Sequence, residues 1–409
     1  MKKIGLIFIS LFLFLSACSQ MEGTSSDVGE SWEDIVAAAD GSVVKIFMWG
    51  GDEGINRYMD EWVAPYVKSE YGVTLERVPM DTGEILQKLQ TEKAAGKEEG
   101  TIDIIWINGE NFKNAKNGEL LYGPIQEILP HFASYYDTES DVYSYDFGTE
   151  IAGLEAPWGK VQFVFNYDEE KIPNPPTTVE ELVAWVEENP GKFTYPNPSD
   201  FTGNAFLRHI LYSSAGGYET FLEEGFSEEL AEDSSQELWT ILNDMKENLW
   251  RSGDTYPSDL TELDRLYSQG EVWMTMGYNE ARAGHMIEDG VFPETTKSFV
   301  LEDVGSIGNT HFLAVPFNSP NKSGALVAIN ALLSPEAQYV KMTDEYWGES
   351  TPISLDKLDD EYRQKFEGIE RSEAVLSKEE LDASFVPEID AGYVEWLKEQ
   401  WTDEVVEKP

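Results

Sequence analysis

The alternation of buried strands with amphipathic helices near the start of the chain most constrains its fold. Apolar runs typical of buried strands span residues 43–49, 73–78 and 102–107, and a helical pattern fills each interval, the second of them over 82–97. Pro65 lies inside the first helical pattern, which we expect it to bend or end. Strand and helix in alternation predict a parallel sheet with helices on its faces. In such sheets, ligands lie beyond the carboxyl ends of the strands.

After Pro157 the pattern becomes less regular, and no internal repeat is visible. The elements that we expect there are an extended run at 161–166, a helix from Thr178, a strand at 193–196, a helix from Phe206 that ends at Gly216 and Gly217, an acidic helix to about Asn248, a helix capped by Ser258, a strand at 271–278, a strand at 311–318 and a helix at 324–333. Strands and helices are thus mixed along the whole chain, which indicates an α/β fold.

The first 17 residues predict a secretory signal peptide. Lys2 and Lys3 precede an apolar core at 4–15, which is too short to span a bilayer because a spanning helix needs about 20 residues. The core ends in LSAC, which resembles the lipobox of bacterial lipoproteins, so we expect cleavage before Cys18 and lipidation of its thiol. The alternative is a chance cysteine in an ordinary signal peptide. Residues 18–40 are small and polar and predict a flexible tether.

Composition excludes several classes of function. Cys18 is the only cysteine, so the mature body has no disulfide, no thiolate metal site and no thiol nucleophile. The formal net charge of −48 makes nucleic acid an unlikely partner, because phosphates repel such a surface. The four histidines have no metal-ligand spacing, and no serine lies in a GxSxG motif. We therefore expect no catalytic residues, no metal and no cofactor.

The order of five motifs carries a family resemblance. A strand–helix segment ending DIIWINGENF is followed by APWGKVQFVFNYD, PNPPTTVEELVAWVEENPGKFTYPNP, LDRLYSQGEVWMTMGYNEARAG and HFLAVPFNSPNKSGALVAINALLSPEAQ. Behind a lipobox, this order resembles the extracellular solute-binding proteins of ABC transporters with the type II periplasmic-binding-protein fold. The resemblance is greatest to the YnjB-type branch, a neighbour of thiamine, polyamine, iron and sugar binders, and covers residues 43–338.

The resemblance implies an α/β fold of two lobes, joined by two crossing strands, with an interlobe cleft that closes on a ligand. It implies a monomer, tethered outside the cell membrane, that passes a small solute to an ABC permease and its ATPase. We expect the first part of lobe one at 41–157, a crossing strand and lobe two at 158–310, and a return to lobe one with C-terminal helices at 311–409. The crossings should lie near 158–165 and 305–313.

The stretch KIFMWGGDEGIN places two glycines between a strand and a helix. A phosphate-binding loop needs a lysine and a hydroxyl after its glycines, whereas this turn has Asp52 and Glu53, which would repel a phosphate. The turn could be purely structural. The resemblance instead implies that it faces the cleft, with Trp49 and the backbones of Gly50 and Gly51 near the ligand.

The loop that follows the third strand is the next candidate. Trp106, Asn108 and Glu110 combine a stacking face with hydrogen-bonding groups at the carboxyl end of a strand. The alternative is an ordinary polar loop. Trp158, beside the first expected crossing, is a further candidate for the same cleft.

Two stretches of the expected second lobe complete the site. SDFTGNAFLR begins a helix, and its N-terminal N–H groups, with Phe201 and Thr202, would point into the cleft unless the stretch serves only as a cap. Tyr278 and Asn279 lie at the end of a strand that is otherwise core. Asn309 and Thr310 are secondary candidates at the second crossing.

The candidate residues favour a cationic, amine-bearing or partly aromatic ligand. Aromatic rings with carboxylates attract cations, and Arg208 is the one possible positive partner, more plausibly in a structural ion pair. A thiamine-like or polyamine-like solute fits, a neutral sugar stacked on the rings is the alternative, and the helix N-terminus leaves a ligand of both signs open. Tyr135 and Tyr136 lie outside the region where iron binders carry their tyrosine pair, so we interpret them as packing. An extracellular polysaccharide-processing enzyme is the alternative from another class.

Overall fold

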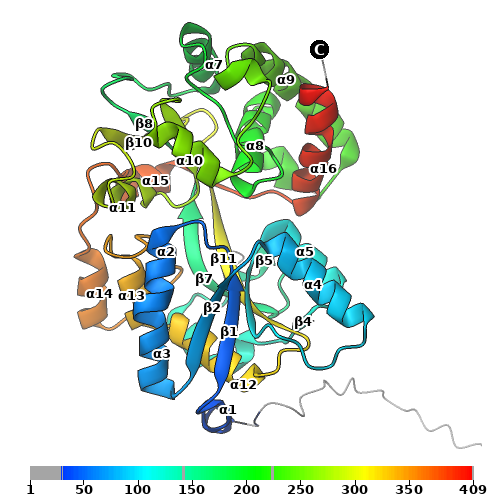
Figure 1. The fold of residues 1–409 in the computed structure, drawn as a ribbon, viewed down its shortest axis with the longest axis vertical. Coiled ribbons are helices and arrows are strands. Elements are labelled where there is room, and N and C mark those ends of the chain that lie inside the picture. Colours follow the sequence, from blue (N-terminus) through cyan, green and yellow to red (C-terminus); the bar gives the residue numbers. More distant parts are fainter. Residues whose placement is uncertain (1–28, 30, 141–142, 223–224, 408–409) are drawn as a thin grey trace, which may run out of the picture.

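The computed structural model describes residues 29, 31–140, 143–222 and 225–407. The predicted signal peptide, Cys18 and most of the tether lie outside these residues. The described chain forms two α/β lobes, one above the other in Figure 1. The expected two-lobed architecture is therefore confirmed. In the part of the chain that the structure describes, no helix combines the length and the apolar character needed to cross a membrane.

Lobe one is built on a sheet in the order β12-β11-β3-β1-β2. Strand β1 (Val43–Met48) pairs in parallel with β2 (Thr74–Pro79) and with β3 (Ile104–Ile107), so their carboxyl ends share one edge. The helices of this lobe are α1 (Trp32–Ala39), α2 (Glu53–Arg57), α3 (Ala64–Tyr71), α4 (Thr82–Ala94), α5 (Gly109–Asn117), α6 (Pro130–Tyr135), α12 (Lys322–Leu332), α13 (Pro335–Lys341) and α14 (Asp360–Glu367). A short strand, β4 (Leu121–Tyr122), pairs with β11, and β5 (Tyr145–Asp146) with β6 (Thr149–Glu150) forms a hairpin.

The chain stays helical through Pro65. A π-helical turn over Tyr58–Val63 joins α2 to α3, and Pro65 lies in the first turn of α3. The expected end of the helix at Pro65 does not occur, and the helix is instead irregular just before the proline, where the Ala64 N–H donates to Met59 O five residues back. Gly72 then ends α3 in the left-handed conformation, with φ of 69°.

Lobe two contains a three-stranded sheet, in which β8 (Val164–Asp168) pairs antiparallel with both β9 (Met274–Gly277) and β10 (Thr296–Phe299). Its helices are α7 (Val179–Glu188), α8 (Phe201–Ala215), α9 (Glu228–Lys246), α10 (Leu260–Ser268), α11 (Arg282–Glu288), α15 (Lys378–Ser384) and α16 (Ala391–Trp401), followed by a π-helical turn at Thr402–Val406.

Two local predictions for lobe two were wrong. The expected strand at 193–196 does not form: Phe193 and Tyr195 are buried, but the segment makes only isolated backbone contacts, such as Trp250 N–H to Phe193 O at 2.8 Å. Its apolar residues fill the core without a strand beside them to complete a ladder. Asp259, rather than Ser258, caps α10, because the Asp259 carboxylate accepts from the Glu262 N–H at 2.8 Å.

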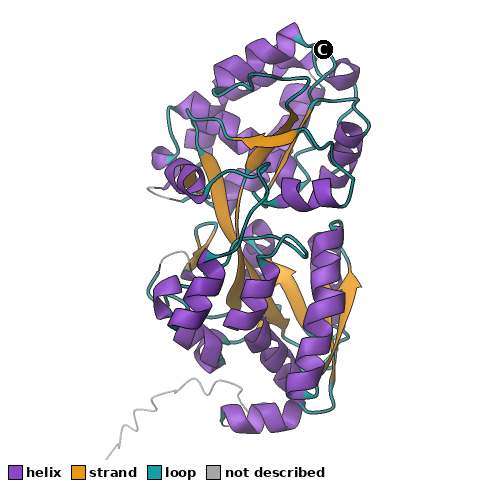
Figure 2. Ribbon diagram, turned by 90° about the vertical axis from the view of Figure 1, so that its left-hand side faces the viewer, coloured by secondary structure: helices purple, strands orange, loops and turns teal. Residues whose placement is uncertain are grey.

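Two long strands join the lobes. Strand β7 (Glu155–Gln162) pairs antiparallel with β11 (Ser306–Pro316) from Gly308 opposite Gln162 to Ala314 opposite Glu155, with an irregularity between His311 and Phe312. Figure 2 shows these strands passing from one lobe into the other.

The chain then passes between the lobes a third time. Phe366 belongs to the core of lobe one, whereas Val386 and Tyr393 belong to that of lobe two. Between them, β12 (Phe385–Pro387) adds in parallel to the beginning of β11. The C-terminal helix α16 therefore packs on lobe two, against α8 and α9.

A buried histidine fastens lobe two to the second crossing strand. His209 Nδ1–H of α8 donates to Ala205 O at 2.7 Å, and its Nε2 accepts from the Ile307 N–H of β11 at 3.2 Å. This pair of contacts requires a neutral ring. Burial, with the Arg208 charge adding to it, lowers the pKa of His209 to about 3, and the bond to Ala205 only partly opposes this.

Candidate functional site

A cavity of about 490 Å³ lies between the lobes, at the carboxyl ends of β1, β2 and β3. Its walls are formed by Trp49, Ile55, Asp81, Thr82, Gly83, Trp106, Asn108, Asn111, Val161, Ser199, Asp200, Phe201, Thr202, Ser258, Asp259, Leu260, Thr261, Tyr278, Asn279, Asn309, His311 and Trp347. A larger hollow of about 1300 Å³ lies on lobe two between α9 and the C-terminal turns, but it receives no residue of lobe one. Only the smaller cavity joins both lobes at the strand ends, where ligands of such sheets bind.

Aromatic rings form the lobe-one wall of this cavity. The Trp106 ring lies 4.7 Å from His311 and 5.5 Å from Trp347, measured between centroids, and His311 stacks on Trp347 at 5.6 Å with 19° between planes. Trp158 is fully buried behind them, edge-on to Trp106 at 5.3 Å. These rings therefore pack against one another and form one continuous aromatic wall.

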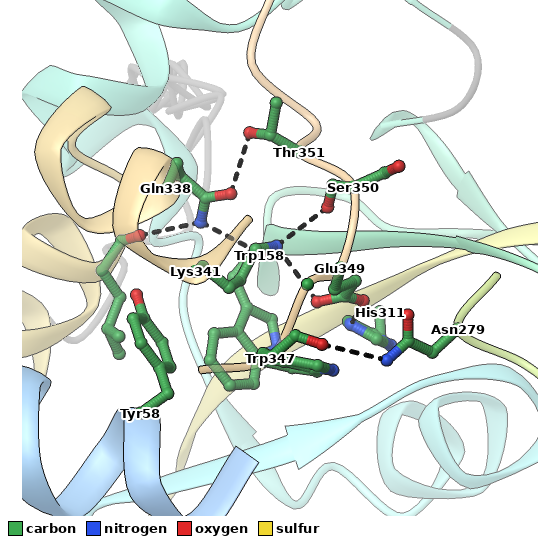
Figure 3. A network of polar contacts seen from close by, with 12 residues as sticks. Tyr58, Trp158, Asn279, His311, Gln338, Lys341, Trp347, Glu349, Ser350 and Thr351 are labelled. Atoms are coloured by element: carbon green, nitrogen blue, oxygen red, sulfur yellow. Dashed lines mark hydrogen bonds and ion pairs between the residues drawn. The ribbon is translucent and has the colours of Figure 1, made fainter. Parts of the chain in front are cut away.

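A buried polar network holds this aromatic wall from behind, as Figure 3 shows. Glu349 pairs with the Lys341 ammonium at 3.1 Å and with the His311 ring. Lys341 also donates to Trp158 O at 2.7 Å and thereby ties α13 to the crossing strand β7. Asn279 of lobe two donates to Trp347 O at 3.3 Å. The rings are therefore linked to both lobes and to the hinge.

Two helix N-termini of lobe one point at the cavity without a side-chain cap. Asp81 and Asn108 occupy the N-cap positions of α4 and α5, and neither side chain accepts a hydrogen bond from its helix. The Gly109 N–H of α5 is satisfied by Asp146 instead, at 2.6 Å. The first turn of α4, at Thr82 and Gly83, therefore presents N–H groups to the cavity.

Lobe two also presents two helix N-termini, but each is capped by a carboxylate. Asp200 accepts from the N–H groups of Thr202 and Gly203 at 2.9 and 3.2 Å, and Asp259 caps α10. Burial raises the pKa of Asp200 to about 6; the amides of its cap oppose this shift and the neighbouring Asp259 charge adds to it. Both carboxylates line the cavity, so this wall carries negative charge at neutral pH.

The lobes touch on both sides of the crossing strands, at α2 and α11 on one side and at α5 and α16 on the other (Figure 1). On the first side, Asp52 of α2 meets Arg282 at 3.4 Å and His285 at 3.3 Å, and Arg282 also pairs with Asp264 at 2.5 Å. Burial alone would raise the pKa of Asp52, but its bond to His285 and the His285 and Arg282 charges hold that pKa well below its ordinary value. On this side the contact is a buried ionic network.

On the other side the contact is partly exposed. Glu110 of α5 pairs with Lys398 of α16 at 2.5 Å, and their side chains are 20% and 31% exposed. The N-terminus of α16 makes a further contact with lobe one, since the Ala391 N–H donates to Phe147 O at 3.0 Å. The two contacts thus join the lobes on either side of the crossing strands.

Seven of the eleven residues predicted to bind ligand line the cavity: Trp49, Trp106, Asn108, Phe201, Thr202, Tyr278 and Asn279. Four others lie near it but outside its walls: Gly50, Gly51, Glu110 and Trp158. A side chain at Gly51 would collide with the Trp49 ring, which lies 2.3 Å from the ideal Cβ position, so this glycine makes room for a cavity-lining ring.

Sequence reasoning missed several cavity residues. His311 had been placed only as the start of a strand, and Trp347 lies beyond the segment that carries the resemblance. Asp81 and Asp259 could not be identified as cavity residues from the sequence, because an aspartate that caps a helix and one that contacts a ligand leave the same pattern. The one indication of Trp347 in the sequence was the stretch DEYWGES, in which aromatic residues directly follow polar residues at the end of a helix.

No group of three histidine, aspartate or glutamate side chains that could hold a metal ion occurs among the described residues. Arg208, the one possible cationic partner, makes a buried pair with Glu388 and does not line the cavity. The lining itself contains no lysine and no arginine. The cavity thus offers rings, amides, hydroxyls and carboxylates to a small molecule.

Comparisons with known proteins agree with this geometry. The sequence profile of the family "Bacterial extracellular solute-binding protein" matches residues 61–363. Protein YnjB of Escherichia coli (strain K12) is 35% identical over 373 residues, which are 90% of this chain and 92% of that protein. The profile match covers most of the cavity lining but begins after Trp49 and Ile55.

Solved structures share the fold at low identity. A putative spermidine/putrescine ABC transporter protein from Listeria monocytogenes has a TM-score of 0.61 and 16% identity, over 90% of this chain and 99% of that one. A periplasmic thiamin binding protein has a TM-score of 0.61 and 15% identity, over 90% and 96%. AfuA from Actinobacillus pleuropneumoniae, with fructose-6-phosphate bound, has a TM-score of 0.63 and 13% identity, over 90% and 99%. The chain therefore belongs to the bacterial extracellular solute-binding proteins, with the type II periplasmic-binding-protein fold.

Proposed function

We propose that this protein captures a small cationic or amine-bearing solute in the interlobe cavity and delivers it to an ABC permease. The observation that carries the ligand class is the lining: braced aromatic rings on lobe one, the carboxylates of Asp81, Asp200 and Asp259, and no lysine or arginine. A cation above an aromatic face gains on the order of 0.5–2 kcal/mol per good contact. Thiamine-like and polyamine-like compounds have this chemistry.

Closure supplies the signal to the permease. Ligand that touches both walls binds the closed form better than an open one, so it shifts the population of the protein toward closure. The Asp52 network and the Glu110–Lys398 pair join the lobes in this structure, and lobe opening would have to break such contacts. The permease would then recognise the closed outer surface.

Calorimetry tests the ligand class. The purified protein is titrated with thiamine, its phosphates, spermidine and maltose, and the same probes are recovered afterwards and checked by mass spectrometry for turnover. We expect heat from an amine-bearing probe and recovery of that probe intact. If maltose alone gives heat, the proposal of a cationic ligand is wrong, and the ligand is a neutral sugar stacked on the same rings. Small-angle scattering should show compaction with the probe that binds.

The uncapped first turn of α4 supports an extension of the ligand class. Its N–H groups suit an anionic or carbonyl group, so a ligand with an amine toward lobe two and a phosphate or carboxylate toward lobe one would satisfy both walls. Thiamine monophosphate against thiamine in the same titration measures this directly. A gain in affinity from the phosphate supports the donor role of α4.

An enzyme is a weaker alternative. A glycoside-cleaving enzyme needs two carboxyl groups free to act on the substrate. Asp200 and Asp259 are instead held as helix caps, and the relatives of this chain are solute-binding proteins. The intact recovery of the probe in the calorimetric experiment separates the two functions.

We further propose that a lipid on Cys18 anchors a monomer to the outer face of the cell membrane. The LSAC stretch after an apolar core supports this proposal. The variant Cys18→Ser should move the protein from the membrane fraction to the soluble or secreted fraction. An unchanged membrane fraction would refute the anchor while leaving the binding function untouched.

A further inference from the structure

The segment that leads from β12 to α16 brings a carboxylate to the back of the ligand cavity. Strand β12 pairs in parallel with β11, with Ser306 opposite Phe385 and Gly308 opposite Pro387. Continued by one residue, this register sets Glu388 beside Asn309 of the crossing strand. Glu388 lies beyond residue 363, where the match to the family profile ends. It does not line the cavity.

Glu388 contacts two residues that do line the cavity. Its Oε1 accepts from the Tyr278 hydroxyl at 2.5 Å and from Asn309 Nδ2 at 3.2 Å, and its Oε2 pairs with the Arg208 guanidinium. Arg208 in turn donates to the Tyr278 oxygen at 3.2 Å. The Glu388 side chain is 6% exposed and that of Arg208 is 0% exposed. This cluster is therefore fixed and largely dry.

The Glu388 carboxylate determines the orientation of the Asn309 side-chain amide. A carboxylate only accepts hydrogen bonds, so it requires the amide nitrogen of Asn309 to face it. Asn309 Oδ1 is then turned away, and it has no hydrogen-bond partner among the described residues although Asn309 is only 8% exposed. A buried acceptor without a partner is costly, and a ligand N–H or O–H would satisfy it.

The same cluster fixes Tyr278. Its hydroxyl donates to Glu388 and accepts from Arg208, which leaves one hydroxyl orientation. The ring packs edge-on against Phe163 at 5.6 Å and at a tilt against Phe201 at 5.1 Å, so both ends of the side chain are held. Without the carboxylate, the hydroxyl and the Asn309 amide would each be free to turn.

We propose that Glu388 is a positioning residue of the ligand site: from outside the cavity it orients Tyr278 and Asn309 so that Asn309 Oδ1 accepts a hydrogen bond from the ligand. This rests on the proposed function of the cavity. The required ligand group is a donor, such as an amine or a hydroxyl. The C-terminal segment thereby acts in recognition as well as in holding lobe two together.

The test replaces both residues of the buried Arg208–Glu388 pair at the same time. Glu388→Gln alone leaves the Arg208 charge buried without a partner and could prevent folding. The double variant Arg208→Met/Glu388→Leu exchanges the ion pair for apolar side chains of similar length, which such pairs tolerate well. The exposed Lys378–Asp382 pair of α15, replaced by Met and Leu in the same way, is the matched control.

Affinity is measured by calorimetry with the amine probe that binds best, spermidine or thiamine. We expect the Arg208/Glu388 variant to melt near the wild-type temperature and to bind at least about tenfold more weakly, while the control binds as the wild type. In a background that carries Tyr278→Phe and Asn309→Ala, the same double change should cost no further affinity. Full affinity in the double variant, or an equal loss in that background, would reduce Glu388 to a purely structural role.

A measurement without ligand keeps this test independent of the proposed function. In protein labelled with ¹⁵N-asparagine, the side-chain amide of Asn309, identified with Asn309→Ala, should exchange slowly with solvent because it donates to a carboxylate. The Arg208/Glu388 variant should exchange it faster. An unaltered exchange rate would contradict the positioning role even if none of the probes binds, in which case the proposed ligand class fails separately.

Discussion

Both walls of the cleft contain helix N-termini, but the two lobes cap them differently. Lobe one leaves the first turn of α4 without a side-chain cap and adds indole rings to the same cavity lining. Lobe two neutralises α8 and α10 with the carboxylates of Asp200 and Asp259. A capped N-terminus repels anions and an uncapped one attracts them. Lobe one thus offers rings, free N–H groups and the Asp81 carboxylate to a ligand, whereas lobe two offers the carboxylates of two capped helices.

The walls also differ in how they are supported. The rings of lobe one rest on one another and on the buried Lys341–Glu349 pair. The wall of lobe two depends on α8, which is fastened to the crossing strand by His209 and oriented by the C-terminal segment. Both walls are thus tied to the crossing strands, lobe one through the Lys341–Trp158 contact and lobe two through His209, and the wall of lobe two is also held by the C-terminal segment.

The largest expected effect comes from breaking the aromatic wall. Trp106→Ala removes the ring that contacts His311, Trp347 and Trp158 at once, so both stacking surface and bracing are lost. We expect at least about 2 kcal/mol of binding free energy, or about 30-fold in affinity, to disappear in calorimetry. Trp62→Ala is the matched control, because Trp62 stacks on Tyr58 and Tyr66 and does not line the cavity. Equal losses in both variants would show that the effect is general destabilisation.

The next largest effect is the pH dependence of the contact by which His209 attaches α8 to the crossing strand β11. Since the pKa of His209 is lowered from 6.5 to about 3, its neutral form stabilises the fold above about pH 6.5, and this contribution is lost as the pH falls toward 3. Each pH unit in that window removes roughly 1.4 kcal/mol from the free energy of unfolding. His209→Gln does not titrate, so the stability difference between wild type and variant should shrink on acidification in urea denaturation. Parallel pH profiles would contradict this role of His209.

A smaller effect concerns the charge of the lobe-two wall. Asp200→Asn keeps the helix cap but removes the carboxylate, and we expect about tenfold weaker binding of spermidine at neutral pH. Because the pKa of Asp200 is raised to about 6, the wild type should lose affinity for the cation as the pH falls through that value, whereas the variant should show a flatter profile. Stability responds oppositely: a raised carboxyl pKa makes the fold more stable as the pH falls from about 6 toward 3.8. Calorimetry at constant ionic strength across this pH range measures affinity directly and so separates the effect on binding from the opposite effect on stability.

The smallest effect comes from the partly exposed interlobe pair. Lys398→Ala removes the partner of Glu110, and pairs of such exposure contribute about 1 kcal/mol or less. We expect affinity to fall by about fivefold or less at low salt and to match the wild type at high salt. A salt-independent loss would mean that Lys398 acts through the packing of α16 and not through its charge.

The sequence predicted the strand ends of lobe one well, because buried strands and helical periodicity are local signals. Trp49, Trp106 and Asn108 line the cavity for that reason: Trp49 and Asn108 directly follow a strand and Trp106 lies near the end of one, and parallel pairing sets the direction of both strands. Glu110 follows the same strand as Asn108 yet points to Lys398, because helix α5 begins between them and turns the side chain away. Periodicity says which residues follow a strand but not which helix of the other lobe lies opposite.

The sequence by itself determined the α/β class, the family and the order of the two lobes, because these follow from hydrophobic period, strand–helix alternation and motif order. Only the tertiary structure decided which acidic residues recognise a ligand and which support the fold. Asp52, Asp200 and Glu388 look alike in the sequence, yet one is buried between lobes, one lines the cavity and one orients its neighbours. A carboxylate's role depends on its distance to groups more than 70 residues away, such as Asp52 to Arg282, separated by 230, and no local pattern encodes that distance.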